Sequence, residues 1–463
     1  MTRNPEFQRQ LWLNGSPSLL AWSLGLSALI LALPLALAPA HERAADLDAT
    51  AMIGLWIAST GYGSLLAGRS LAEEARQNTW DWQRLSTLSP WRMAWGKLLG
   101  SAIPAWMYTL WFALATLIVS AGWTGHISIS LHSVALAILW GLGLQTWAMN
   151  SVLMAWGQRE IPTNRRRAAL LPILLLLFVL GPSLTRVYDH LLNDNQQAVL
   201  WWGLDLGGKG MAYLFGALLL GLGLLTLWRQ LCARLDVRTL PWAWPTGLAT
   251  GSFFIAGTLH AGLPAFWAAT FWIALTATAY AALQHMHSHL RSWRQVQWSA
   301  SRGRWRDMLE ALPLWPVSWL LALAAFALLL FWPPAHESPI DHGTGLEALL
   351  ACLQLLRDCL ILTGFALLAG RLRSPLAAFC IAWTIINIVL PLLALGLVGA
   401  GGAALVQPAM AMLLLSSRET PALFSAMAWI SLGLQLLLAA GWTSWIFRDR
   451  VLGFAHEHAA SHR

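Results

Sequence analysis

Long apolar stretches, separated by shorter polar segments, run through the chain from residue 19 to residue 446. A helix that crosses a bilayer needs roughly 20 mostly apolar residues, because it must satisfy its backbone hydrogen bonds within the hydrocarbon. Twelve stretches meet this requirement: 19–39, 50–68, 99–122, 132–156, 168–186, 210–228, 243–260, 263–284, 313–333, 346–369, 376–397 and 422–446. The pattern therefore predicts an all-α polytopic membrane protein with about 12 transmembrane helices.

The loops repeat in the same order in two halves of the chain, 1–235 and 236–463. In each half the second and third predicted spans are joined by a long basic segment that contains tryptophan. The residues Arg76, Gln77, Trp80 and Arg84 lie 218 positions before Arg294, Gln295, Trp298 and Arg302. Because both halves have six spans, the pattern predicts two parallel six-helix repeats, related by an axis along the membrane normal.

Composition narrows the class of protein further. The chain is 57% apolar and 11% charged, against about 25% charged residues in soluble domains, which excludes an ordinary soluble enzyme. Four cysteines within apolar runs do not indicate a disulfide framework. The apolar run near the N-terminus is too long for a signal-peptide core, so we interpret it as a retained membrane anchor.

The basic residues predict the orientation of the chain. With the N-terminus inside, the cytoplasmic segments hold 24 basic and 10 acidic residues, while the opposite side holds 4 basic and 10 acidic ones. Cytoplasmic loops retain arginine and lysine during insertion, so both termini are expected in the cytoplasm. The net charge of +8 thus reflects orientation, and we expect no nucleic-acid partner.

Tryptophan is unusually frequent, with 30 residues. Indole rings favour the membrane–water interface, and several tryptophans lie at predicted span ends, among them Trp201, Trp202, Trp442 and Trp445. We therefore expect most of the tryptophans to anchor the spans at the interface.

The most specific pattern lies between the second and third predicted spans. Acidic and basic residues are followed there by a leucine-rich stretch, a Ser-Pro turn and a Gly-Lys pair that opens the next span. Its residues are Glu73, Glu74, Arg76, Thr79, Arg84, Ser89, Pro90, Gly96 and Lys97. This segment resembles the signature of type-2 ABC exporter permeases, although Asn78 stands where that family usually has glycine.

The resemblance implies a coupling helix that docks a cytosolic ABC ATPase, in two copies, in a bacterial inner membrane. ATP and Mg²⁺ would bind to that partner, because no phosphate-binding Gly-x-x-x-x-Gly-Lys-Ser/Thr loop is present in this chain. We expect this chain itself to hold no cofactor, metal or catalytic residue. The physical alternative is an amphipathic helix that only lies on lipid headgroups of the bilayer.

The second half has a more degenerate counterpart, which lacks both the Ser-Pro turn and the Gly-Lys pair. The residues of this second coupling segment are Arg294, Gln295, Trp298, Arg302 and Arg304. Its basic and tryptophan-bearing pattern predicts an amphipathic cytoplasmic helix as well.

Two charged residues, Arg357 and Asp358, lie within the tenth predicted span. A lone charge at the bilayer centre costs at least ~2.5–3.5 kcal/mol, so each should have a partner. Neighbours on a helix point about 100° apart, so we expect each to meet a group on another helix. Carried back to the first half, the position of Asp358 corresponds to Gln145. The pair either lines a transport pathway together with Gln145 or is structural.

These observations favour the permease subunit of an ATP-driven exporter that moves a hydrophobic or amphipathic substrate of unknown identity. The alternative is an ion- or proton-coupled secondary transporter of twelve spans, which should carry several ionisable residues at mid-membrane. A membrane enzyme should carry clustered carboxylates at one face, whereas the predicted outer acids, such as Glu42, Asp46 and Glu337, are scattered.

Overall fold

The computed structural model describes residues 4–77, 83, 85, 88–156, 200–235, 237, 239–259, 262–284, 289–331, 344–372, 374–399, 402, 406–407 and 422–453. Ten helices in these ranges are long and apolar enough to cross a membrane, which confirms an all-α polytopic membrane protein. The predicted fifth span, 168–186, lies outside the described residues. The predicted seventh span is a helix of 16 residues, α11.

Contacts group the chain into two compact units, Met1–Thr239 and Leu240–Arg463. The elements of the first unit are α1 (Pro5–Asn14), α2 (Pro17–Leu37), α3 (Arg43–Trp56), η1 (Ile57–Tyr62), α4 (Gly63–Arg76), α6 (Pro90–Ser101), α7 (Ile103–Val119), η2 (Ser120–Thr124), α8 (Ile127–Trp156), β1 (Leu200–Trp201), β2 (Leu204–Asp205) and α10 (Gly207–Arg234). The two short strands pair antiparallel, and the η elements are π-helical turns.

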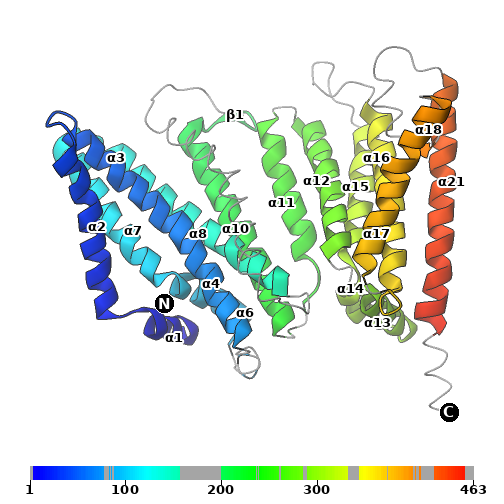
Figure 1. Cartoon of the computed structure of the whole chain (residues 1–463), viewed down its shortest axis with the longest axis horizontal. Coiled ribbons are helices and arrows are strands. Elements are labelled where there is room, and N and C mark those ends of the chain that lie inside the picture. The colour runs from blue at the N-terminus through cyan, green and yellow to red at the C-terminus, as the bar shows by residue number, and fades with distance from the viewer. Residues whose placement is uncertain are drawn as a thin grey trace. The chain divides into compact units, whose positions relative to one another are not determined.

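The longest helix of the first unit is formed by α3, η1 and α4 without a break. Its 34 residues extend over about 50 Å at 1.5 Å per residue, well beyond the roughly 30 Å of bilayer hydrocarbon. The α4 end therefore projects past the apolar part of the span. In Figure 1 this end approaches α6 at the bottom of the unit, close to α1.

Helix α6 is the centre of packing at this end of the first unit. Its Met93 and Ala94 side chains are completely buried, against residues of α4, α8 and α10 such as Leu71, Met149 and Leu227. After α6 the chain bends at Ala102, because Pro104 has no backbone N–H to continue the helix. The third span accordingly begins at α7, and α6 is a separate helix before it.

Tryptophan joins α8 to α10 along their length. The indole nitrogens of Trp140 and Trp147 donate to the carbonyls of Ala212 and Leu219, at 3.1 and 3.0 Å. The two tryptophans are seven residues apart on α8, and their acceptors are seven residues apart on α10, which is close to two helical turns. These tryptophans hold helices together within the bundle, a role that the expected interfacial belt did not include.

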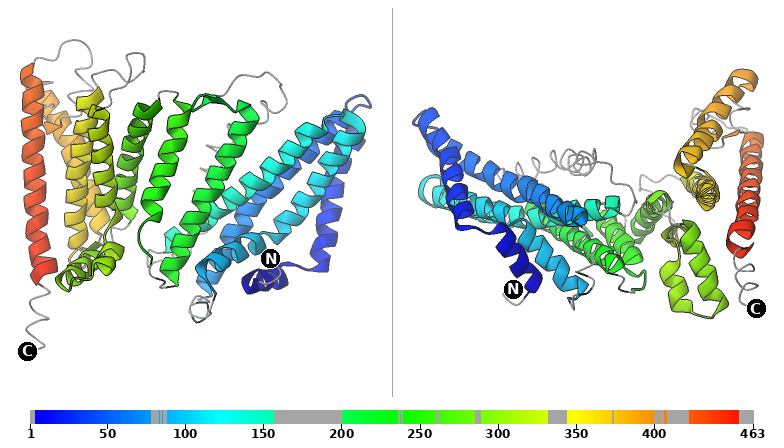
Figure 2. Two further views of the ribbon diagram at one scale, coloured as in Figure 1. Left: turned by 180° about the vertical axis from the view of Figure 1, so that it is seen from behind. Right: turned by 60° about the horizontal axis from the view of Figure 1, so that its bottom comes forward.

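The second unit consists of α11 (Ala243–Thr258), α12 (Gly262–Gln284), α13 (His289–Ser301), α14 (Trp305–Ala311), α15 (Leu314–Phe331), α16 (Thr344–Leu367), α17 (Pro375–Thr384), η5 (Ile385–Val389), α18 (Leu390–Val398), α21 (Ala422–Phe447) and η6 (Arg448–Leu452). Helix α12 packs against α11, α15 and α16, while α16 also packs against α17 and α21. Helices α13 and α14 form a hairpin at one end of these spans (Figures 1 and 2).

Each unit has an arginine at the end of its last span that contacts the end of its fourth span. In the first unit Arg234 donates to the carbonyl of Leu153 at 3.0 Å. In the second, Arg450 donates to the carbonyl of Ala369 at 3.2 Å. Arg450 follows Arg234 by 216 positions, and Ala369 follows Leu153 by the same number. A positive charge at a helix C-terminus compensates unpaired carbonyls and the helix dipole, so the two contacts stabilise corresponding helix ends.

Candidate functional site

The first candidate site contains an N-terminal helix that the sequence pattern did not predict. Helix α1 begins with Asn4 as its cap, whose Oδ1 accepts from the backbone N–H of Glu6 at 3.1 Å, and Pro5 occupies the first turn. The polar side chains of Glu6 and Gln10 are buried, whereas Trp12 is 87% exposed. The helix thus turns its polar face toward the protein and its apolar face outward, as expected at a membrane interface.

The buried face of α1 completes a cluster of five polar side chains, which we call the N-terminal charge cluster: Glu6, Arg9, Gln10, Glu74 and Lys97. Lys97 is 1% exposed and lies between the carboxylates of Glu6, at 3.2 Å, and Glu74. Arg9 binds Glu6 through two nitrogens, at 2.8 and 3.1 Å, and also binds Glu74. Gln10 donates to Glu74 at 3.0 Å. The cluster connects α1, α4 and α6.

The charges of the cluster balance, with two carboxylates facing one ammonium and one guanidinium. Burial by itself would raise the pKa of Glu6, but the hydrogen bond from Arg9 and the charges of Lys97 and Arg9 outweigh it and lower that pKa. The hydrogen bond from Arg9 to Glu6 raises the pKa of Arg9. Removal of any one of the four charged side chains leaves a buried charge without its partner.

Two glycines allow α1 to lie close to α6. A Cβ atom at Gly96 would come within 2.8 Å of the Glu6 Cβ, and one at Gly100 within 2.4 Å of the Gln10 Cβ. The spacing of four residues places both glycines on one face of α6. The Gly-Lys pair singled out in the sequence therefore has a structural reason: Gly96 admits α1, and Lys97 neutralises its carboxylate.

The other predicted residues of this segment surround the charge cluster. Ser89 caps α6, with Oγ 3.4 Å from the amide of Arg92, and Pro90 follows as the first helical residue. Glu73 faces away and accepts from Arg76 at 2.5 Å, in an exposed pair at the end of α4. Thr79 and Arg84 lie outside the described residues. Glu74 and Lys97 are buried, and both contact α1.

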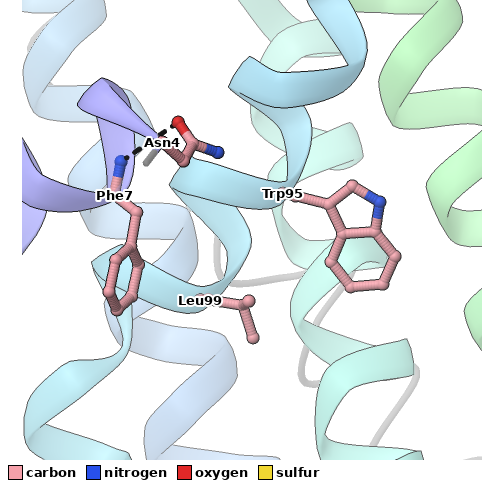
Figure 3. A pocket seen from close by; sticks show the side chains of 4 residues that line it. All are labelled: Asn4, Phe7, Trp95 and Leu99. Carbon is pink, nitrogen blue, oxygen red and sulfur yellow. Dashed lines mark hydrogen bonds between the residues drawn. The ribbon is translucent and has the colours of Figure 1, made fainter. Parts of the chain in front are cut away.

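An apolar hollow lies at the contact between α1 and α6 (Figure 3). It is lined by Asn4, Phe7, Trp95 and Leu99. Asn4 closes one end, since its Nδ2 donates to the carbonyl of Arg92 at 2.7 Å while its Oδ1 caps α1. None of these four lining residues is charged.

A sequence signal for α1 was present. Asn4-Pro5 is a helix start, and Glu6, Arg9 and Gln10 are spaced at i, i+3 and i+4 on one face. The helix was missed because it has only ten residues and directly precedes the predicted span 19–39.

In the second unit the predicted coupling segment forms the α13–α14 hairpin. Arg294 donates from Nε and Nη2 to the carbonyl of Arg450, at 3.0 and 2.9 Å. Burial and the charge of Arg450 lower the pKa of Arg294. Gln295 and Trp298 are exposed, and Arg302 and Arg304 lie over the Trp298 ring. The segment thus contains all five predicted residues but presents a basic, aromatic surface instead of a balanced buried cluster.

The second candidate site surrounds Arg357, which is 1% exposed. All five N–H groups of its guanidinium have acceptors: two bonds reach Asp358, at 2.7 and 2.9 Å, and one each reaches Asn387, Gln407 and Gln435. Asp358 also accepts from the Trp383 indole at 2.9 Å. We call these six residues the Arg357 network. It connects α16 with α17, η5, α21 and the 406–407 segment.

Each of the two charges meets a group on another helix, as expected: Arg357 donates to Asn387 and Gln435, and Asp358 accepts from Trp383. In addition, the long Arg357 side chain folds back and binds Asp358 on its own helix. It meets other helices through neutral amides. Asn387 and Gln435, each the one amide residue of its predicted span, were a usable signal, because an intramembrane amide needs a partner.

Gln145, the predicted counterpart in the first half, has a different environment. It is fully buried and donates to the carbonyl of Ser59 at 3.1 Å. Ser59 belongs to the π-helical turn η1, and a Cβ at Gly63 would come within 2.3 Å of the Gln145 amide. Gln145 therefore bridges α8 to the second span and does not form a charged network.

Within the described ranges, no group of three His, Cys, Asp or Glu residues is placed to hold a metal ion. Comparison with models of protein families, with curated proteins and with solved structures finds no match. The candidate functional sites in the described part of this integral membrane protein are therefore the N-terminal charge cluster and the Arg357 network.

Proposed function

We propose that the chain is the permease subunit of an ATP-driven exporter of the type-2 ABC class, acting with a separate cytosolic ATPase in a bacterial inner membrane. Its substrate would be hydrophobic or amphipathic, because the described spans offer apolar walls. The residues 1–235 and 236–463 would be two permease halves, with both termini in the cytoplasm.

One observation carries the proposal: the N-terminal charge cluster joins the motif-bearing helices to a membrane span. A force on α4 or α6 would be transmitted through Lys97 to Glu6 on α1, and from α1 to α2. Buried ion pairs with several partners resist separation, since breaking one leaves an uncompensated charge. A rigid connection of this kind suits a segment that receives motion from a docked ATPase.

The exposed end of α4 offers a docking surface next to this rigid cluster. Glu73 and Arg76 are solvent-accessible there, within one helical turn of buried Glu74. A partner that binds this end would therefore act directly on the cluster.

The equal spacing of the two arginine caps supports a duplication of one six-span unit. Arg234 and Arg450, with their acceptors, share one offset of 216 positions. In both units the second span packs against the first, third and fourth, and the fourth packs against the sixth.

The competing hypothesis is a secondary transporter, and it depends on ionisable groups within the spans. The geometry of Arg357 favours a structural role for the pair, because the guanidinium has no N–H left for a substrate and its charge is balanced by Asp358. We accordingly do not assign a transport pathway to Arg357 and Asp358.

Purification of the full chain from its native membranes in a mild detergent tests the proposal. We expect an ABC ATPase to co-purify and to hydrolyse ATP in the complex. Exchange of Arg76 for glutamate should reduce recovery of that ATPase, whereas exchange of exposed Arg43, on the opposite predicted face, should not. A chain that purifies without any ATPase, and that moves ions in proteoliposomes under a proton gradient alone, would contradict the proposal.

A further inference from the structure

The turn between α13 and α14 gathers an exposed basic and aromatic surface. Arg302, Arg304 and Arg306 are all exposed, and beside them Trp298 and Trp305 are 46% and 65% exposed. Asp307 and Glu310, on the same short helix, are less exposed than the arginines. The accessible charge of this turn is therefore positive.

The backbone of the turn places the arginines on the tryptophan. Gly303 has φ of +66°, and the amides of Gly303 and Arg304 donate to the carbonyls of Ala300 and Ser299, at 3.1 and 3.0 Å. This is the Schellman arrangement, in which a left-handed residue ends a helix and reverses the chain. As a result Arg302 lies 4.1 Å and Arg304 5.5 Å from the centre of the Trp298 ring.

The surface lies close to the membrane. Helix α14 ends at Ala311 and the span α15 begins at Leu314. Two intervening residues extend over less than about 10 Å, so α14 cannot reach far into the cytosol. At this depth tryptophan favours the interface, and arginine favours the phosphate of a lipid headgroup, which it binds through two parallel hydrogen bonds.

We propose that the surface formed by Trp298, Arg302, Arg304, Trp305 and Arg306 binds the headgroup of an anionic phospholipid. Arg304 also lies 3.8 Å from the partly buried Asp307, in a weak pair that a phosphodiester could replace. Exposed Trp305 would lie at the acyl boundary. This contrasts with the first unit, where the corresponding segment neutralises its own charges in a buried cluster. The proposal needs only membrane insertion of the chain, and it does not depend on an ATPase partner.

A fluorescent label beside the turn can report the lipid that occupies it. The full chain carries Ala300→Cys, labelled with NBD, in a background in which the exposed Cys380 is replaced by alanine. It is reconstituted in nanodiscs that contain either brominated phosphatidylglycerol or brominated phosphatidylcholine at equal mole fraction. We expect the anionic lipid to quench the label severalfold more strongly.

The variant Arg302→Gln/Arg304→Gln should abolish most of this preference, since each basic residue near an anionic surface contributes about fivefold to binding. The matched control Arg371→Gln/Arg448→Gln removes the same charge from exposed positions of the same unit and should leave the preference unchanged. Gly303→Ala should lower the preference without any change of charge.

Equal quenching by the two lipids in the parent protein would overturn the proposal. So would an equal loss in the control pair, because the preference would then reflect diffuse charge. If the parent shows no lipid preference and the Arg302→Gln/Arg304→Gln variant loses a co-purifying protein, the surface docks that protein instead, and the lipid proposal is wrong.

Discussion

The ammonium group of Lys97 lies 3.2 Å from the carboxylate of Glu6, a residue 91 positions earlier in the chain. This contact holds α1 against α6. It joins the N-terminal helix to the segment whose sequence resembles the exporter motif. Two consequences can be measured: the stability of the cluster and the position of α1.

Replacement of Lys97 by methionine should destabilise the protein strongly. Glu6 and Glu74 would remain buried with only Arg9 to balance them, and breaking a buried pair in this way costs about 3–5 kcal/mol. Thermal unfolding in detergent, followed by loss of the monodisperse peak, measures the effect.

The control is Arg76→Met, which removes the exposed pair with Glu73 on the same side of the unit and should leave the thermal stability nearly unchanged. The double variant Glu6→Gln/Lys97→Met should recover part of the loss. Equal stabilities of Lys97→Met and Arg76→Met would contradict a buried cluster.

Stability should fall at acidic pH through Glu6. Its pKa in the folded protein lies below the value of 4.5 of a free glutamate, so its ionisation stabilises the folded state fully above pH 4.5. That contribution is lost as the pH falls below 4.5 toward the folded pKa. The unfolding midpoint, measured between pH 7 and 3.5, should therefore drop most steeply in the acid branch of the curve, below pH 4.5.

The variant Glu6→Gln should be less stable at pH 7 and should show a shallower acid branch, because it has no carboxyl to titrate at this position. A variant curve parallel to that of the parent would exclude Glu6 as a source of the pH dependence.

Enlargement of Gly100 should release α1. A side chain at this position meets Gln10 at 2.4 Å, so Gly100→Val must push α1 away from α6. A spin label at Trp12→Cys, on the exposed face of α1, should become more mobile in the Gly100→Val protein. Gly25→Ala provides the comparison, since nothing lies within 4 Å of a Cβ there and the label should not change.

The Arg357 network should require arginine specifically. Lysine has three N–H donors and no planar fork, so Arg357→Lys cannot satisfy all four acceptor residues. We expect a clear loss of thermal stability, larger than that of Trp445→Phe at a 69% exposed position. A stable Arg357→Lys protein would indicate that the network is not structural and would reopen its assignment to a transport pathway.

Trp147 in the α8–α10 contact should stabilise the folded protein through its indole N–H. Trp147→Phe keeps the aromatic ring but loses the bond to Leu219, which should cost about 0.6 kcal/mol and at most about 1.7. The measurement is refolding from denaturing detergent, with Trp445→Phe as the reference. A cost no larger than that of the reference would exclude a stabilising role of this bond.

Much of the fold could be predicted from the sequence because the bilayer imposes a length on apolar helices. The spans from 19–39 to 132–156 fall on described helices for this reason. Helix α1 was missed because it is short and because it buries its polar face, whereas a helix on a protein surface usually buries its apolar face. The break between α6 and α7 at Ala102 was missed because the predicted span 99–122 was drawn through Pro104, which has no backbone N–H to continue a helix.

The candidate site was predicted only in part. Glu74 and Lys97 were singled out by motif, but their partners Glu6 and Arg9 lie more than 60 residues away, and such a contact leaves no local pattern. Arg357 could be identified from its cost in a membrane, whereas the identity of its acceptors depended on where η5 and the 406–407 segment meet α16.

Photocrosslinking at Gln77 tests the central proposal most directly. Gln77 is exposed at the end of α4, one turn from Glu74, and it can carry benzoylphenylalanine without disturbing the cluster. Irradiation of native membranes should crosslink this position to an ABC ATPase, whereas the same group at the exposed Trp123 should not. Crosslinks from Gln77 to lipid alone, or to no ATPase, would contradict an exporter driven by a docked ATPase.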